Sequence, residues 1–189
     1  MIRRLHPLRA SHADLTDEYA AIPGEIKSVC AHFGKEVLTQ IDEADFYAAI
    51  PALRRECGDR AVLRCIHFYQ DNARVPKQVA ALKAGDFDAF LALVAESGRS
   101  SWMYLQNVVP AGYKEHQDVA VSLALCEHYL QGRGAFRVHG GGFAGTVQAF
   151  VPFDLLDSFR AGLDAALGAG ACHVLSIRPQ GGVEAFPVE

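Results

Sequence analysis

Four glycines lie close together near the end of the chain, in the segment GGGFAG. This segment consists of Gly140, Gly141, Gly142, Phe143, Ala144 and Gly145. Each ordered glycine costs roughly 0.5–1 kcal/mol more backbone entropy than alanine, so the four together cost about 2–4 kcal/mol. A domain of ordinary stability has about 5–15 kcal/mol in all. The cluster therefore predicts a loop whose backbone closely approaches another group. The alternative is a tight hairpin, for which two glycines suffice.

The spacing of these glycines matches several nucleotide-binding loops, but their surroundings do not. The segment satisfies G-x-G-x-x-G, yet it is followed by TVQAFV, a run of strand formers, whereas a dinucleotide site requires a helix there. GGGFAGTV also satisfies the protein-kinase pattern, but only 44 residues follow Gly145, and they contain no V-A-I-K, H-R-D or D-F-G. No GK[ST] is present, which excludes a Walker loop.

Two polar residues precede the loop in a predicted strand. Alternation along a strand places Arg137 and His139 on one face and Phe136 and Val138 on the other. Arg137 could support the loop by charge-assisted hydrogen bonds, and His139 could approach a phosphate. The alternatives are a solvated strand arginine and a packed or solvated histidine.

Three basic residues, Arg64, His67 and Arg74, follow at spacings that keep them on one face of a predicted helix. We expect them to form a structural network rather than a ligand site. Cys126-Glu127-His128 and Cys172-His173 contain metal-binding residue types, but neighbouring side chains diverge in a helix and point to opposite faces of a strand. No metal site is therefore expected.

The composition excludes several classes of protein. The chain has 189 residues, half of them apolar, and a net charge of −4, which argues against nucleic-acid binding through phosphate contacts. No apolar run approaches the roughly 18 residues of a membrane span. The first ten residues lack the apolar core of a signal peptide. Five scattered cysteines indicate reduced thiols, mostly in the core, and a cytoplasmic location.

The first two thirds of the chain are predicted to be helical. We expect a break at Pro23-Gly24 and then a helix that ends at Gly34. A second helix, capped by Asp59, is expected to extend to Gly85, and Asp86 is expected to cap the next one. A further buried stripe at helical spacing comprises Val119, Leu123, Cys126 and Leu130.

The last third changes to strands. Strands are expected over 135–139 and 146–151, on either side of the glycine loop, followed by a helix that Pro152 opens and that Gly168 and Gly170 close. A buried strand is expected over 173–177, and a last short strand over 183–186 after a turn at Gly181-Gly182. The order predicts an α+β fold with an antiparallel sheet and helices on one face.

The segment GAFRVHGGGFAG, residues 134–145, resembles the third signature motif of galactokinases, G-x-x-R-M-T-G-G-G-F-G-G. Galactokinases belong to the GHMP superfamily of small-molecule kinases. Val138, His139 and Ala144 replace the methionine, threonine and glycine of that motif.

Two further blocks resemble the same family, in the same order. HADLTDEYAAIPGEI, residues 12–26, is similar to H-x-L-x-x-x-x-Y, and Tyr19 falls on the tyrosine that contacts the sugar. Residues 64–97 resemble the family's helical hairpin, in which Asp71 replaces a glutamate, whereas Gly98 replaces a histidine just beyond it. The positions that match in this block are Arg64, His67, Arg74, Gly85, Asp86, Glu96 and Ser97.

The resemblance implies the C-terminal domain of a GHMP kinase over residues 12–189, with a ferredoxin-like sheet, and an atypical extension over 1–11. The motifs of the family's N-terminal half do not appear: the sugar-recognition motif, the phosphate loop and the catalytic aspartate. No catalytic residue and no bound ATP or Mg²⁺ are therefore expected in this chain, although the complete enzyme would use both. The implied partners are galactose, or a related sugar, and the N-terminal half.

The resemblance implies a galactokinase, which forms galactose 1-phosphate by phosphorylating the anomeric hydroxyl, and this chain is expected to be inactive without the other half. Two alternatives stay open. The complete enzyme could act on another sugar, such as N-acetylgalactosamine, or the chain could be a stand-alone, non-catalytic module that binds a sugar or a protein.

Overall fold

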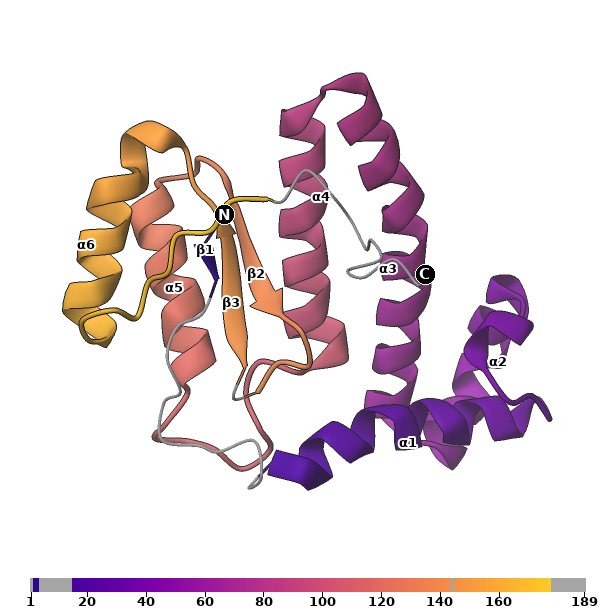
Figure 1. The fold of residues 1–189 in the computed structure, drawn as a ribbon. Coiled ribbons are helices and arrows are strands. Elements are labelled where there is room, and N and C mark those ends of the chain that lie inside the picture. Colours follow the sequence, from indigo (N-terminus) through magenta and orange to yellow (C-terminus); the bar gives the residue numbers. More distant parts are fainter. Residues whose placement is uncertain (1, 4–14, 144, 178–189) are drawn as a thin grey trace, which may run out of the picture.

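The computed structural model describes residues 2–3, 15–143 and 145–177. A helical part comes first in the chain, with helices α1 (Thr16–His32), α2 (Glu43–Glu56), α3 (Asp59–Ala84) and α4 (Phe87–Ser100). A part that combines a sheet with helices follows it (Figure 1). Helices α3 and α4 form a hairpin and lie side by side. They link the two parts, because α3 contacts α1 whereas α4 contacts the sheet.

The predicted break at Pro23-Gly24 is wrong, because α1 continues through Pro23. A proline inside a helix removes one backbone donor, which tertiary packing can offset. Here Val29 and Cys30 of α1 are buried against Val62 and Cys65 of α3. Helices α2 and α3 also contain an internal proline each, at Pro51 and Pro76.

Of the predicted helix ends, most are confirmed. Gly85 ends α3 in a left-handed conformation with φ 70°, and the carboxylate of Asp86 accepts a hydrogen bond from the Ala89 amide at 2.9 Å at the start of α4. Asp59 is not the cap of α3, however, because the capping position is Gly58. The Asp59 carboxylate accepts instead from Arg54 Nε at 2.6 Å.

The predicted hairpin is confirmed as the antiparallel pair β2 (Ala135–His139) and β3 (Thr146–Phe150). Its register pairs Ala135 with Phe150 and His139 with Thr146, so the glycine loop connects the two strands directly. The sequence did not predict β1 (Ile2–Arg3), which pairs with the other edge of β3 and gives a three-stranded sheet in the order β1-β3-β2.

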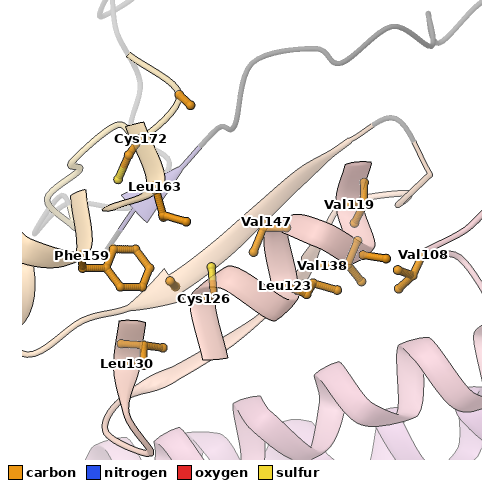
Figure 2. Packing of buried hydrophobic residues seen from close by; sticks show 13 residues of the cluster. Val108, Val119, Leu123, Cys126, Leu130, Val138, Val147, Phe159, Leu163 and Cys172 are labelled. Carbon is orange, nitrogen blue, oxygen red and sulfur yellow. The ribbon is translucent and has the colours of Figure 1, made fainter. Parts of the chain in front are cut away.

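One face of this sheet packs on α5 (Asp118–Leu130) and α6 (Leu156–Leu167), which follows a 3₁₀ turn over Phe153–Leu155. Figure 2 shows the resulting core, in which Val138 and Val147 of the strands lie beside side chains of both helices. The buried members from the two helices are Val119, Ala120, Leu123, Cys126, Leu130, Phe159 and Leu163. The predicted α+β class is confirmed, with α5 and α6 on one face of the sheet, but α4 also packs against β2. In addition, Phe90 of α4 contacts Phe150 from the other face, with ring centroids 5.5 Å apart.

The cysteines lie where core thiols were expected. Four are buried, Cys30 and Cys65 in the core of the helical part and Cys126 and Cys172 in the core beside the sheet, and Cys57 is half-buried. Burial raises the pKa of Cys65 and Cys126 to about 12, mainly because the low-dielectric interior disfavours the thiolate.

The predicted strand over 173–177 is wrong. Val174 forms a single bridge, and all five side chains of this segment are exposed. A strand is stable when a neighbour pairs along its length, and the described residues supply no such ladder for this segment. The last predicted strand, over 183–186, lies outside the described residues.

Candidate functional site

The glycine loop has a left-handed backbone at three of its residues. Gly140 and Gly142 have φ of 71° and 83°, and Phe143 has φ of 52°, which is uncommon for a residue with a side chain. Gly140 and Gly141 are exposed, whereas Gly142 and Phe143 are buried. The loop therefore presents one half of its backbone outward and anchors the other half inside the protein. Ala144 lies outside the described residues.

Tyr19 of α1 reaches this loop, although 123 positions separate it from Gly142. Its hydroxyl donates a hydrogen bond to the Gly142 carbonyl at 2.8 Å, and the same carbonyl accepts from the Gly145 amide at 2.8 Å. The ring stands edge-on to Phe143, with centroids 5.2 Å apart. A Cβ added to Gly141 would lie 2.8 Å from Tyr19 Cε1, so the loop backbone packs directly on the ring.

Asn107 holds the loop from a second direction, and no sequence pattern predicted this contact. Its carbonyl accepts from the Phe143 amide at 2.6 Å, and its side-chain Nδ2 donates to the Gly141 carbonyl at 3.3 Å. A Cβ added to Gly142 would lie 2.0 Å from the Asn107 carbonyl oxygen. The close approach that the glycines predicted therefore exists, and its partners include the protein's own Tyr19 and Asn107. No motif or spacing surrounds Asn107 that would have identified it.

Arg137 faces helix α4. Its Nη1 donates to Ser97 Oγ at 2.6 Å, and Ser97 Oγ in turn donates to the Asp71 carboxylate. Burial lowers the pKa of Arg137, and Arg74 acts in the same direction, whereas Asp71 raises it. The alternative of a solvated arginine is therefore wrong. A supporting role for Arg137 toward the loop stays a prediction.

His139 is the last residue of β2 and lies at the base of the loop, opposite Thr146 in the register. Its side chain is half-buried. Its predicted approach to a phosphate stays a prediction.

The expected polar network joins α3 to α4. Asp71 accepts from Arg74 Nη1 at 3.2 Å, Arg74 Nε lies 3.6 Å from a Glu96 oxygen, and His67 Nδ1 lies 2.9 Å from Ser100 Oγ. Arg64 does not take part in it. This fully buried arginine pairs with Glu25 of α1, with Nη1 2.8 Å from Oε2, and donates from Nε to the Leu105 carbonyl at 3.2 Å.

The described side chains around the loop do not fit a magnesium site. Tyr19, Asn107, Arg137 and His139 carry no carboxylate, and the described residues contain no cluster of three or more histidines, cysteines or acids that could hold a metal ion. Among the same residues, no helix is long and apolar enough to cross a membrane. What the arrangement offers is a preset backbone loop beside a tyrosine.

The chain resembles known proteins in sequence and in fold. No protein-family model matches the chain. The galactokinase of Glaesserella parasuis is 26% identical over 149 residues, which are 79% of this chain and 37% of that protein. The galactokinase of Actinobacillus pleuropneumoniae serotype 3 gives the same values.

Among solved structures, that of Lactococcus lactis galactokinase complexed with galactose matches with a TM-score of 0.65. The match has 22% identity and covers 88% of this chain and 40% of that one. The chain thus spans about two fifths of the length of the proteins that it resembles. It has the fold of part of a galactokinase, and its sequence is similar to those of galactokinases.

Proposed function

We propose that this chain is the C-terminal part of an ATP-dependent galactokinase and that residues 12–189 form its GHMP-type C-terminal domain. On this proposal the complete protein phosphorylates galactose at the anomeric hydroxyl in the cytoplasm. The observation that carries the proposal is the contact between Tyr19 and the glycine loop, at 2.8 Å between Tyr19 Oη and the Gly142 carbonyl. Two separate blocks of galactokinase-like sequence meet at this contact.

The loop and Tyr19 would form one wall of a sugar site. The Tyr19 hydroxyl donates its proton to the Gly142 carbonyl. A phenolic oxygen can accept as well as donate, so on this proposal the Tyr19 oxygen accepts a hydrogen bond from a sugar hydroxyl. The exposed Gly140 and Gly141 have no side chains, which allows a sugar to approach the backbone closely. Because contacts within the chain already hold the loop in place, sugar binding would cost little conformational entropy.

Phosphoryl transfer depends mostly on positioning and on neutralising charge. The chain's own residues position the sugar on this proposal. ATP and Mg²⁺ would be held by the half of the enzyme that carries the phosphate loop and the catalytic aspartate. The chain alone should therefore bind sugar without phosphorylating it.

The first test measures the binding of galactose to the purified chain by titration calorimetry. A second assay measures ADP release in the presence of ATP, Mg²⁺ and galactose. We expect binding and no ADP release. Tyr19→Phe should weaken binding by about tenfold, the effect of losing one hydrogen bond. Tyr47→Phe, on the exposed surface of α2, serves as the control. Release of ADP by the chain alone, abolished in Tyr19→Phe, would contradict the proposal.

A stand-alone sugar-binding module is the second candidate, and the preset loop favours it, because the loop needs no other chain to form. The two candidates differ when the N-terminal half of a related galactokinase is added. A galactokinase part should then support ADP release. A module should bind galactose as a monomer and stay inactive.

A further inference from the structure

Asn107 contacts the glycine loop at two points. It follows the helical turn η3 (Ser101–Leu105) after Gln106, which has φ of 55°, and it is only 2% exposed. Its backbone carbonyl accepts from the buried Phe143 amide at 2.6 Å. Its Nδ2 reaches the carbonyl of exposed Gly141 at 3.3 Å. One residue therefore connects the inner half of the loop to the outer half.

The contact is too close for any residue but glycine at position 142. An added Cβ would lie 2.0 Å from the Asn107 carbonyl oxygen and 2.7 Å from its Nδ2. The φ of 83° at Gly142 disfavours a side chain independently. The backbone of Gly142 therefore packs directly against Asn107, with no room for a side chain between them.

A buried ion pair fixes the segment that carries Asn107. Arg64, which is fully buried, donates to the carbonyl of Leu105, two residues before Asn107, at 3.2 Å. Glu25 neutralises Arg64 and also accepts from Arg60 Nε at 2.8 Å. Burial lowers the pKa of Arg64, and Glu25 opposes that effect, because its carboxylate stabilises the charged guanidinium.

Glu25 lies on α1, the helix that also carries Tyr19. The loop therefore has two anchors, Tyr19 on one side and Asn107 on the other. Both depend on α1, because Tyr19 lies on this helix and Glu25 of the same helix holds Arg64, which bonds the segment that carries Asn107. Tyr19 holds the Gly142 carbonyl, and Asn107 holds the Phe143 amide and the Gly141 carbonyl.

We propose that Asn107 is a positioning residue of the sugar site, which sets the outward-facing backbone of Gly140 and Gly141 through its contacts with the loop, and that the Glu25–Arg64 pair holds Asn107 in place. Asn107 acts through the loop and need not contact the sugar. The inference rests on the proposed function, because it concerns the same loop, but the position of the loop can be measured without any ligand.

The test compares the ¹H–¹⁵N spectra of the wild-type chain, Asn107→Ala and the control Asn72→Ala, whose asparagine is exposed on α3. We expect Asn107→Ala to shift the amide signals of the four loop glycines while the signals of α5 and α6 stay in place. The control should leave all of them unchanged. Unchanged glycine signals in folded Asn107→Ala would overturn the inference.

A second variant keeps the test decisive if Asn107→Ala does not fold. Asn107→Asp has the same shape, but its carboxylate cannot donate to the Gly141 carbonyl, whereas the protonated acid can. The glycine signals of Asn107→Asp should therefore return toward wild-type positions as the pH is lowered through the pKa of the new carboxyl. Glycine signals that are displaced equally at every pH, or not displaced at all, would count against a positioning role.

Galactose titration then separates this inference from the proposed function. If the wild type binds galactose, Asn107→Ala should bind it about tenfold more weakly, which corresponds to losing one hydrogen bond between the displaced loop and the sugar. Equal affinity of a variant with a displaced loop would overturn the link between loop and sugar. Absence of binding by the wild type itself would remove the proposed function, while the glycine signals still decide whether Asn107 positions the loop.

Discussion

The glycines of the loop are required for different physical reasons. Gly142 is both left-handed, with φ of 83°, and in close contact with Asn107. Gly140 has a similar φ of 71°, but no atom lies within 4 Å of the position that its Cβ would occupy. Gly141 has no positive φ and instead packs on the Tyr19 ring. A side chain would therefore cost conformational strain at one position, a ring displacement at another, and both strain and overlap with backbone at Gly142.

This difference leads to a prediction for two matched variants. Gly140→Ala should lower the free energy of unfolding by about 1–2 kcal/mol, the cost of one left-handed residue. Gly142→Ala should lower it by more than about 4 kcal/mol, because overlap with the Asn107 carbonyl adds to the same strain. Urea unfolding of both variants measures the difference. Equal losses would mean that the contact with Asn107 does not restrict position 142.

At the level of secondary-structure elements, buried polar contacts connect the helices. Glu25 joins α1 to Arg64 of α3, and Asp71 of α3 joins Ser97 of α4, which accepts from Arg137 of β2. Burying charged groups is costly unless they are paired. These contacts therefore specify how the helices are arranged, and any change that leaves one charge alone should be expensive.

Removal of the carboxylate from the Glu25–Arg64 pair tests this cost. Glu25→Gln leaves the fully buried Arg64 without a counter-charge, so the free energy of unfolding should fall by about 3–5 kcal/mol. Glu36→Gln, at an exposed position, is the control and should change it by less than about 0.5 kcal/mol. Urea unfolding measures both. A loss in Glu25→Gln no larger than in the control would show that Arg64 does not depend on Glu25.

His67 of α3, which contacts Ser100 of α4, makes the stability of the protein depend on pH. Burial lowers its pKa, Arg137 and Arg74 do so as well, and Asp71 raises it. The unfolded chain therefore takes up a proton near pH 6.5 that the folded chain takes up only at lower pH. Stability should fall as the pH is lowered from about 6.5 to the folded pKa, by up to about 1.4 kcal/mol per pH unit from this group.

The measurement is the urea midpoint as a function of pH for the wild type and His67→Gln. The variant should lose less stability over this range than the wild type does. His128→Gln, with an exposed ring on α5, is the control. An identical pH profile in the wild type and His67→Gln would refute the assignment to His67.

On the level of the whole molecule, apolar surface remains on one side. A groove of about 840 Å³ lies between the α3–α4 hairpin and β3, and its wall includes Leu82, Phe90 and Phe150. At its rim Phe87 is 65% exposed and Phe153 is 95% exposed. Exposed apolar patches of this kind are uncommon on monomeric proteins.

The groove should make the isolated chain bind the dye 8-anilinonaphthalene-1-sulfonate, which becomes fluorescent on apolar surfaces. Phe87→Ser, at the rim, should reduce the fluorescence by about half or more, because it removes a large part of the exposed aromatic surface. Val121→Ser on α5, also half exposed, is the control and should have little effect. Equal fluorescence from the wild type and Phe87→Ser would argue against dye binding in the groove.

Local signals in the sequence were sufficient to predict many of the helices and strands of this protein. The strands around the glycine loop, the stripe of Val119, Leu123 and Cys126, and the end of α3 at Gly85 depend on residues close together in the chain. Their periodicity and turn chemistry are visible in a single sequence. The same holds for the family resemblance, which depends on short motifs in a fixed order.

Contacts between segments that are distant in the sequence could not be predicted from such local patterns. Packing of α1 on α3 offset the break expected at Pro23, and the absence of a neighbouring ladder among the described residues left 173–177 without a strand. The anchors of the loop depend on Tyr19 and Asn107, which meet the glycines only after the chain has folded. Motifs indicated Tyr19, but nothing indicated Asn107. A single asparagine has no periodicity, and its role arises from the backbone that folding brings within hydrogen-bond distance.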